Sequence, residues 1–343
     1  MQNQNNIDNI YTIIDPLNPL NQDGFSSTYL VRNENNHNLY AAKVMENEDH
    51  QHFNRELQMT AILSGLNNPN IIHLVGHGKG VVTIRGNPKN NINYLILDYH
   101  PKGSLFDYVK ITLHGFTELL AKYIFDKILR IVQAIHGAGI SHRNLRLENI
   151  LLDQNFNPII WNFSLATNNN VNKLYDFVGT QGYESPQIVK HQVYNGFKAD
   201  IFSLGALLFN LVSGLQGFEN ASNNDEYYRL ISQKNFNDYW IVMQHCGVNP
   251  SQLFKNLYLR MVAFKENDRP TIDQILQDPW FNQIRNLNND QQAQLDNQIH
   301  NEFVTLENQI LQQNNQQNQP NQQHQQNHPN QQNHPNLQNQ QNQ

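Results

Sequence analysis

Apolar and polar side chains alternate along the first part of the chain. In the runs 11–14 and 28–31, apolar residues mix with polar ones at short intervals, and turn-forming residues separate the two runs. A period of two is typical of β-strands that bury one face. We therefore expect the residues up to about position 48 to form strands of a small antiparallel sheet.

The apolar pattern then continues through a predicted helix at residues 53–66. Two further strand-like runs follow, at residues 71–75 and 94–97. A polar segment at residues 98–103 interrupts the pattern and predicts a connection between two parts of the fold. The first of these parts is a β-rich region over residues 9–97.

Beyond residue 101 the spacing of the apolar side chains becomes helical. One amphipathic helix is marked by apolar side chains three or four positions apart, namely Leu119, Tyr123, Ile124, Ile128, Ile131, Val132 and Ile135. Several more helices are expected as far as residue 284. The pattern thus predicts an α+β fold whose second part, residues 101–284, is helical.

A short amphipathic helix is predicted within residues 285–311. Ile299, Phe303, Leu306 and Ile310 recur at helical spacing there. The stripe is much shorter than the repeat that a coiled coil requires. Of the two interpretations, a docked helix and a coiled-coil seam, we therefore favour a helix that docks on the preceding helical region.

The last part of the chain, residues 312–343, consists mainly of Gln and Asn with scattered His and Pro. Such a segment cannot bury enough apolar surface to fold, so we expect it to be disordered, with a tendency to self-associate. Its histidines are irregularly spaced and give only a weak indication of metal binding.

Composition and charge limit the classes of partner. The net charge is −6, only 15% of residues are charged, and no block of Lys and Arg is present, which argues against nucleic-acid and anionic-membrane surfaces.

The single cysteine, Cys246, cannot form an internal disulfide. The longest apolar stretch, residues 202–212, is too short to span a membrane and predicts a buried helix. With its polar start, the chain is expected to be cytoplasmic.

The segment His142-Arg143-Asn144-Leu145-Arg146-Leu147-Glu148-Asn149, followed by Trp161-Asn162-Phe163-Ser164, carries the strongest signal in the sequence. It resembles the catalytic core of the protein kinases, in which H-R-D-L-x-x-x-N precedes D-F-G. The resemblance covers about residues 9–284. It implies the two-lobed kinase fold, with a β-rich N-lobe at 9–97, a helical C-lobe at 101–284 and the polar segment between them as the hinge.

Both aspartates of the kinase pattern are replaced by asparagine. In the family the first accepts the proton of the substrate hydroxyl and the second holds Mg²⁺. Asn144 cannot take that proton, because an amide has no useful basicity near neutral pH. Asn162 offers the cation a neutral carbonyl in place of a carboxylate, so Mg²⁺ binding is not expected. Arg146 and Asn149 remain as parts of a catalytic site in which no catalytic carboxylate is intact.

The resemblance also implies remnants of an ATP pocket. Tyr40-Ala41-Ala42-Lys43 matches the V-A-I-K strand, whose Lys contacts the phosphates. Ala41 and Leu151 would lie above and below the adenine, and Asp98 and His100 lie in the hinge. ATP binding through these residues is expected to be weak.

The glycine-rich loop that wraps the phosphates in kinases is eroded. Anchoring the motif on Phe25 places Asn21, Asp23 and Ser26 at its three glycine positions, while Gly24 falls between them. Side chains at these positions crowd the phosphates, and the Asp23 carboxylate would repel them.

Two residues compete as the partner of Lys43. The segment 53–56 resembles the start of the kinase helix that carries the paired glutamate, which makes Glu56 a candidate. Counting back from the segment 68–72, which resembles the H-P-N-I-I turn after that helix, places Met59 at this position instead. The count favours Met59, which would leave Lys43 without an ion pair.

Trp161 precedes the N-F-S segment, at a position that is usually small in kinases because it lines the nucleotide pocket. An indole there is expected to occupy space that the nucleotide needs. The alternative is an indole rotated into the core between the lobes.

The C-lobe keeps its structural landmarks. The segment 179–187 resembles G-T-x-x-Y-x-A-P-E with its last Glu replaced by Gln187, so Arg269 would meet an amide. Asp200 stands where the family's aspartate braces the catalytic loop. The residues between Phe218 and Phe281 are most similar to the calmodulin-dependent and AMP-activated type of Ser/Thr kinase.

These features predict a pseudokinase, that is, a kinase-like binding or allosteric module. Its partner would be a protein, such as another kinase or a signalling complex, with no nucleic-acid or membrane partner. One alternative is a weakly active ATP-dependent protein serine/threonine kinase. Another is an assembly protein in which the Gln/Asn-rich segment is the functional part.

Overall fold

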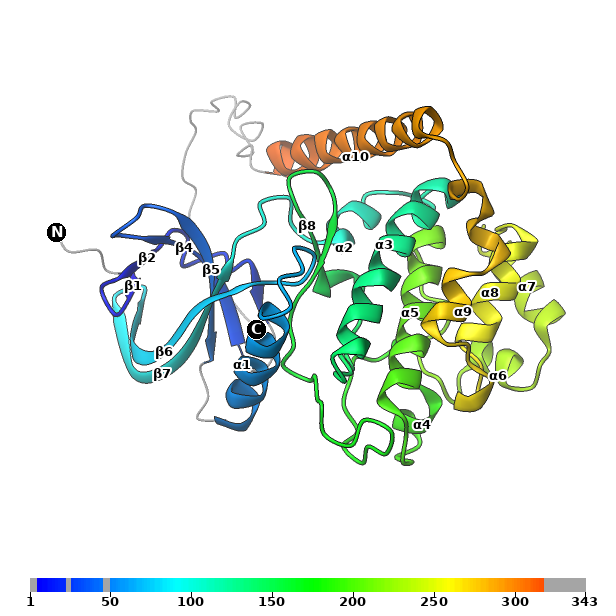
Figure 1. The fold of residues 1–343 in the computed structure, drawn as a ribbon, viewed down its shortest axis with the longest axis horizontal. Helices are drawn as coiled ribbons and strands as arrows, with labels where there is room; N and C mark the ends of the chain where they lie inside the picture. Colours follow the sequence, from blue (N-terminus) through cyan, green and yellow to red (C-terminus); the bar gives the residue numbers. More distant parts are fainter. Residues whose placement is uncertain (1–4, 23–25, 46–49, 318–343) are drawn as a thin grey trace, which may run out of the picture.

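The computed structural model describes residues 5–22, 26–45 and 50–317, and it has two lobes (Figure 1). The N-terminal lobe is a β-sheet with one helix, and the C-terminal lobe is almost entirely helical. The predicted α+β plan with two lobes is therefore confirmed.

The N-lobe sheet closes on itself. Its strands are β1 (Asn6–Ile7), β2 (Tyr11–Ile13), β3 (Asn21–Gln22), β4 (Ser26–Asn33), β5 (Leu39–Met45), β6 (Leu74–Ile84) and β7 (Asn87–Asp98). The order is β2-β1-β6-β7-β5-β4-β3, all neighbours are antiparallel, and β2 also pairs with β4. Alternate side chains from these strands, including Val31, Val44 and Ile96, fill the interior.

The hairpin of β6 and β7 is longer than the sequence predicted. The two strands meet at Arg85 and Gly86, both with positive φ, as expected for a tight two-residue hairpin turn. Glycines interrupt the apolar pattern in β6, and at Gly78 a Cβ would collide with the Tyr94 ring of β7. The predicted strand at residues 71–75 is largely wrong, since Ile71 forms only an isolated bridge with Ile160.

Helix α1 (His50–Ser64) belongs to the N-lobe and matches the helix predicted at 53–66 within a few residues. In the C-lobe, α3 (Glu118–Gly137) contains all the predicted apolar positions of the first long helix. The lobe also contains the α-helices α2 (Leu105–Val109), α4 (Pro186–Val189), α5 (Gly196–Ser213), α6 (Glu226–Ser232), α7 (Phe236–His245), α8 (Gln252–Met261) and α9 (Ile272–Leu276), and short 3-10 helices at Leu147–Asn149, Glu266–Asp268 and Pro279–Ile284.

Helix α5 contains the apolar stretch at residues 202–212. It is long and apolar enough to cross a membrane by composition alone, but 83% of it is buried inside the C-lobe. It packs against α8 and α3. The prediction of a buried core helix is confirmed.

Arg269 and Gln187 form the buried contact that the sequence predicted. Arg269 donates to the Gln187 side-chain oxygen over 2.6 Å and to the backbone carbonyls of Ala263 and Lys198 over 2.9 Å each. Burial lowers the pKa of Arg269 to about 10. The amide therefore replaces a carboxylate as a hydrogen-bond acceptor without supplying its charge.

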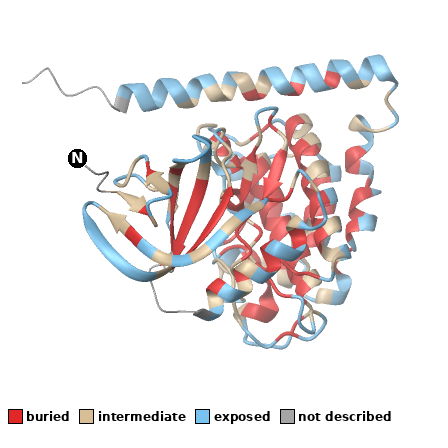
Figure 2. Ribbon diagram, turned by 60° about the vertical axis from the view of Figure 1, so that its left-hand side comes forward, coloured by how far each residue is buried: buried red, intermediate tan, exposed pale blue. Residues whose placement is uncertain are grey.

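Helix α10 (Asn289–Gln317) crosses the outside of the C-lobe (Figures 1 and 2). Phe303 is fully buried, and its ring centroid lies 5.0 Å from that of Phe156, 5.7 Å from Tyr108 and 5.9 Å from Phe116. These contacts confirm that the predicted amphipathic helix docks on the helical lobe.

The helix extends past the predicted boundary at Gln312. Residues 312–317 are helical although their sequence predicted disorder, because backbone hydrogen bonds continue a docked helix without further apolar contacts. Residues 318–343, which carry the rest of that prediction, lie outside the described part of the chain.

Phe303→Ala should lower the free energy of unfolding by about 3–5 kcal/mol, because it empties a fully enclosed aromatic site. Leu311→Ala is the matched control on the same helix. The Leu311 side chain is exposed, so its removal should change the stability by no more than about 0.5 kcal/mol. Urea unfolding of the two variants measures both values, and equal losses would show that α10 is not held by this site.

Candidate functional site

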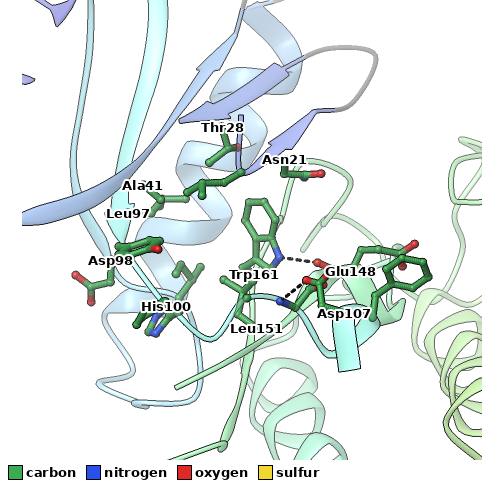
Figure 3. Close-up of a pocket in the computed structure, with 17 residues that line it drawn as sticks. Asn21, Thr28, Ala41, Leu97, Asp98, His100, Asp107, Glu148, Leu151 and Trp161 are labelled. Atoms are coloured by element: carbon green, nitrogen blue, oxygen red, sulfur yellow. Dashed lines mark hydrogen bonds between the residues drawn. The ribbon is translucent and has the colours of Figure 1, made fainter. Parts of the chain in front are cut away.

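A cavity of about 310 Å³ lies between the two lobes (Figure 3). Ala41 of β5 and Leu151 of β8 (Ile150–Leu152) line opposite sides of it, and Asp98 and His100 line it from the hinge. Strand β8 pairs with β9 (Pro158–Ile160), which leads directly to Trp161. The structure thus brings Ala41, Leu151, Asp98, His100 and Trp161 together around one cavity, whereas the predicted pocket residues Lys43 and Glu56 do not line it.

Lys43 pairs with Glu56 in this structure. The Lys43 Nζ lies 2.8 Å from Glu56 Oε1 and 2.8 Å from Oε2, and both side chains are almost completely buried. The inference that Met59 takes the partner position is therefore wrong. The prediction of Met59 came from counting back from residues 68–72. Helix α1 already ends at Ser64, so that count included residues that are not part of the helix. Met59 lies one turn further along and packs into the hydrophobic core.

Asn162 connects Lys43 to the catalytic loop. Its Oδ1 accepts from Lys43 Nζ over 2.9 Å, and its Nδ2 donates to Asn149 Oδ1 over 3.1 Å. Ser164 Oγ also donates to Asn162 Oδ1. A carboxylate at position 162 could not donate to Asn149. The two side chains at the metal positions of the kinase pattern are thus hydrogen-bonded directly to each other.

The Asn144 side chain is also engaged within the protein. Its Oδ1 accepts from Thr180 Oγ1 over 2.7 Å, and its backbone carbonyl accepts from Asn149 Nδ2 over 2.7 Å. Arg146 donates to Thr180 Oγ1 over 3.2 Å and to Glu148 Oε2 over 2.9 Å. Sequence reasoning missed Thr180 as a partner of Asn144, although it belongs to the G-T segment of the kinase pattern.

Asp200 holds the catalytic loop as the sequence predicted. Its carboxylate accepts from the backbone N–H groups of His142 over 2.9 Å and Arg143 over 2.7 Å, and from Ser141 Oγ over 3.0 Å. Burial by itself would raise the pKa of Asp200, but its hydrogen bond with His136 and the nearby imidazoles lower it below the usual value. The carboxylate is therefore ionised, and it fixes the loop that carries Asn144.

Trp161 lies on the wall of the cavity, between Thr28 and Leu151 (Figure 3). Its indole N–H donates to the Glu148 carbonyl over 3.0 Å, and its ring centroid lies 5.7 Å from Lys43 Nζ. The ring also packs against the hydrophobic core. The indole thus separates the open part of the cavity from the buried lysine.

The eroded glycine loop is described only in part. Asn21 of β3 pairs with Thr28 of β4, and both residues line the cavity. Ser26 is buried in β4. Asp23 and Gly24 lie outside the described residues.

A kinase fold implies ATP and Mg²⁺, but the residues at the metal positions do not fit the cation. Mg²⁺ demands near-ideal octahedral geometry and usually binds through carboxylates. Asn162 and Asn149 are neutral, and their mutual hydrogen bond uses the Asn149 oxygen that would face a metal. The two side chains therefore do not form a site for Mg²⁺.

The comparisons with known proteins agree with the fold. The family described as protein kinase domain matches residues 18–281. The chain is 32% identical over 243 residues to NUAK family SNF1-like kinase 1 of Homo sapiens, which covers 70% of this chain and 33% of that protein. It is 27% identical over 273 residues to CBL-interacting protein kinase 26 of Oryza sativa subsp. japonica, covering 78% and 52%.

A third relative is CBL-interacting serine/threonine-protein kinase 19 of Arabidopsis thaliana, 29% identical over 268 residues, which cover 75% of this chain and 50% of that protein. The chain thus spans between a third and about half the length of these relatives. They are Ser/Thr kinases of the type that the C-lobe pattern indicated. The chain belongs to the protein kinase family.

Proposed function

We propose that this chain is a pseudokinase, which binds and regulates a protein partner without transferring phosphate. The direct hydrogen bond between Asn162 and Asn149 carries the proposal. This bond pairs two side chains with each other that a working kinase directs at its metal.

The absence of a general base supports the same conclusion. Asn144 accepts from Thr180 and lacks a basic atom at neutral pH. Loss of general-base catalysis alone slows a reaction by roughly 10² to 10⁴ fold. The missing metal carboxylate at position 162 adds a second, independent loss.

The structural contacts around the two altered catalytic positions are present. The ion pair of Lys43 with Glu56 and the brace from Asp200 position α1 and the catalytic loop through buried contacts. Because these contacts are complete within the chain, the lobes can hold one arrangement without nucleotide. A fixed arrangement of this kind suits a module that presents its surface to another kinase or a signalling complex.

A weakly active ATP-dependent protein serine/threonine kinase is the second candidate. The pairing of Lys43 with Glu56 favours it, since this lysine contacts phosphates in working kinases. The relatives are also named as kinases. In this case Arg146 would supply a positive charge near Asn144 through their shared contact with Thr180.

Phosphotransfer by the wild-type chain on generic Ser/Thr substrates should equal the background of Lys43→Met, because neither the base nor the metal carboxylate is present. A radiolabelled transfer assay measures this. Turnover within about tenfold of the usual kinase range of roughly 1–100 s⁻¹, abolished by Lys43→Met, would establish the second candidate instead.

ATP with Mg²⁺ should give the wild type little or no thermal stabilisation, because the indole takes up space on the cavity wall and the two amides at the metal positions are hydrogen-bonded to each other. A ligand at a hundredfold its Kd adds about 2.7 kcal/mol, which is readily visible as a shift in Tm. The variant Asn144→Asp/Asn162→Asp should stay unresponsive while Trp161 remains. Adding Trp161→Ala should produce a Mg²⁺-dependent shift.

The controls for this series are the same variants with ATP and EDTA. Trp161→Ala alone should respond weakly and without dependence on Mg²⁺, since it lacks the carboxylate. A clear Mg²⁺-dependent shift in the wild type would contradict the proposed function.

A further inference from the structure

Lys43, Glu56 and Asn162 form a compact group from which water is excluded. Lys43 Nζ lies 2.8 Å from each Glu56 carboxylate oxygen and 2.9 Å from Asn162 Oδ1. Lys43 and Glu56 are at most 1% exposed, and Asn162 is 6% exposed. A nucleophilic amine, a carboxylate that can carry protons and an amide carbon thus meet out of contact with solvent.

The amine nitrogen lies within reach of the Asn162 amide carbon. Because a C=O bond is about 1.2 Å long, the carbon bonded to Oδ1 lies at most about 4 Å from Lys43 Nζ. Reacting atoms attack from about 3–3.5 Å, so a shift of up to about 1 Å in either side chain gives the amine an attacking position.

Two further side chains hold the Asn162 amide in an orientation that suits attack. Ser164 Oγ donates to Asn162 Oδ1 over 2.9 Å, and negative charge develops on this oxygen when an amine adds to the carbon. Asn162 Nδ2, the nitrogen that would leave, donates to Asn149 Oδ1 over 3.1 Å. The carbonyl is therefore polarised and the leaving nitrogen is held in place.

The surroundings of Lys43 favour a neutral amine over an ammonium ion. The Trp161 ring centroid lies 5.7 Å from Lys43 Nζ and separates it from the open part of the cavity, and the neighbouring Phe163 is fully buried. Removal from water disfavours the charged form of an amine, which is how buried lysines become nucleophiles. Glu56 is in place to accept the proton that Lys43 gives up.

We propose that the Lys43 amine and the Asn162 side-chain amide join in an isopeptide bond, with Glu56 moving the protons. Lys43 gives one proton to Glu56, and the amine electron pair then forms the Nζ–Cγ bond while the carbonyl π electrons move to Oδ1. When the carbonyl re-forms, the Cγ–Nδ2 bond breaks, Glu56 gives its proton to Nδ2 and takes a second proton from Nζ. Ammonia leaves, accepts this proton as ammonium and returns Glu56 to its carboxylate form.

The bond would join the two lobes covalently. Lys43 lies in β5 of the N-lobe and Asn162 follows β9 of the C-lobe, 119 positions away. This inference goes beyond the proposed function and does not depend on it. A chain without the bond can still be a pseudokinase, so a failure of the bond to form leaves the phosphotransfer result untouched.

Intact-mass measurement of the full wild-type chain tests the proposal. The folded chain, kept at physiological temperature, should lose about 17 Da, the mass of one ammonia, in a fraction that grows over days. After trypsin digestion, residues 33–55 and 147–173 should appear as one linked peptide that is not cleaved at Lys43. Lys43→Met removes the amine and should give no linked peptide.

Two variants test the roles of the neighbouring groups. Glu56→Gln keeps the size of the side chain but cannot carry protons, so the bond should form at least about 10²-fold more slowly. Ser164→Ala leaves the buried ion pair intact and keeps the test available if Glu56→Gln does not fold. Loss of its hydrogen bond to Oδ1 should slow formation by about tenfold or more.

The chain also contains a matched internal control. Lys127 Nζ lies 2.7 Å from Asn157 Oδ1, but Lys127 forms no ion pair within the part of the chain that the structure describes. No linked peptide is expected for this pair. A wild-type chain that yields no peptide linked between Lys43 and Asn162 would overturn the proposal, even if other Asn or Gln side chains lose ammonia. Equal rates of bond formation in the wild type and Ser164→Ala would also contradict it.

Discussion

The buried ion pair between Lys43 and Glu56 is the interaction on which the rest of the site depends. Both side chains are about 1% exposed, so neither charge is solvated by water. Breaking a buried pair by removing one partner typically costs about 3–5 kcal/mol, because the other charge is left uncompensated. Since Lys43 lies in β5 and Glu56 in α1, the pair fixes the helix against the sheet. It also directs the lysine nitrogen at Asn162.

Replacing an aspartate by an asparagine at position 162 changes what this arrangement can do. The oxygen still accepts from Lys43, so the lobes keep their contact. The amide nitrogen now donates to Asn149, whose own amide donates to the Asn144 carbonyl. The asparagine at position 162 thus keeps the contact with Lys43 and joins Asn149 and Asn144 in one hydrogen-bonded network within the chain. A fully satisfied buried network rigidifies the structure around it.

Much of the fold could be predicted because its signals are local and periodic. The stripe that contains Phe303 predicted a docked helix, and the kinase motifs placed Asp200, Ala41 and Leu151 correctly. Met59 was predicted in place of Glu56 because both residues lie on one face of α1. The choice between them depended on the length of the turn after the helix, which the sequence does not give.

The contacts of Thr180 and Asp176 were not predictable for a different reason. Each joins residues more than thirty positions apart, Thr180 to Asn144 and Asp176 to Arg143, and no pattern in the sequence reports such a pairing. The length of the β6–β7 hairpin was hidden by glycines that carry no apolar signal.

We propose that the Asn162–Asn149 contact occupies the place where a working kinase holds its metal. Paramagnetic Mn²⁺ tests it directly, because this ion broadens the NMR signals of any group that it approaches. Once the side-chain amide signals of Asn162 and Asn149 are assigned, we expect both to stay sharp and unshifted when Mn²⁺ and ATP are added to the wild-type chain. Selective broadening of these two signals at stoichiometric Mn²⁺ would contradict it.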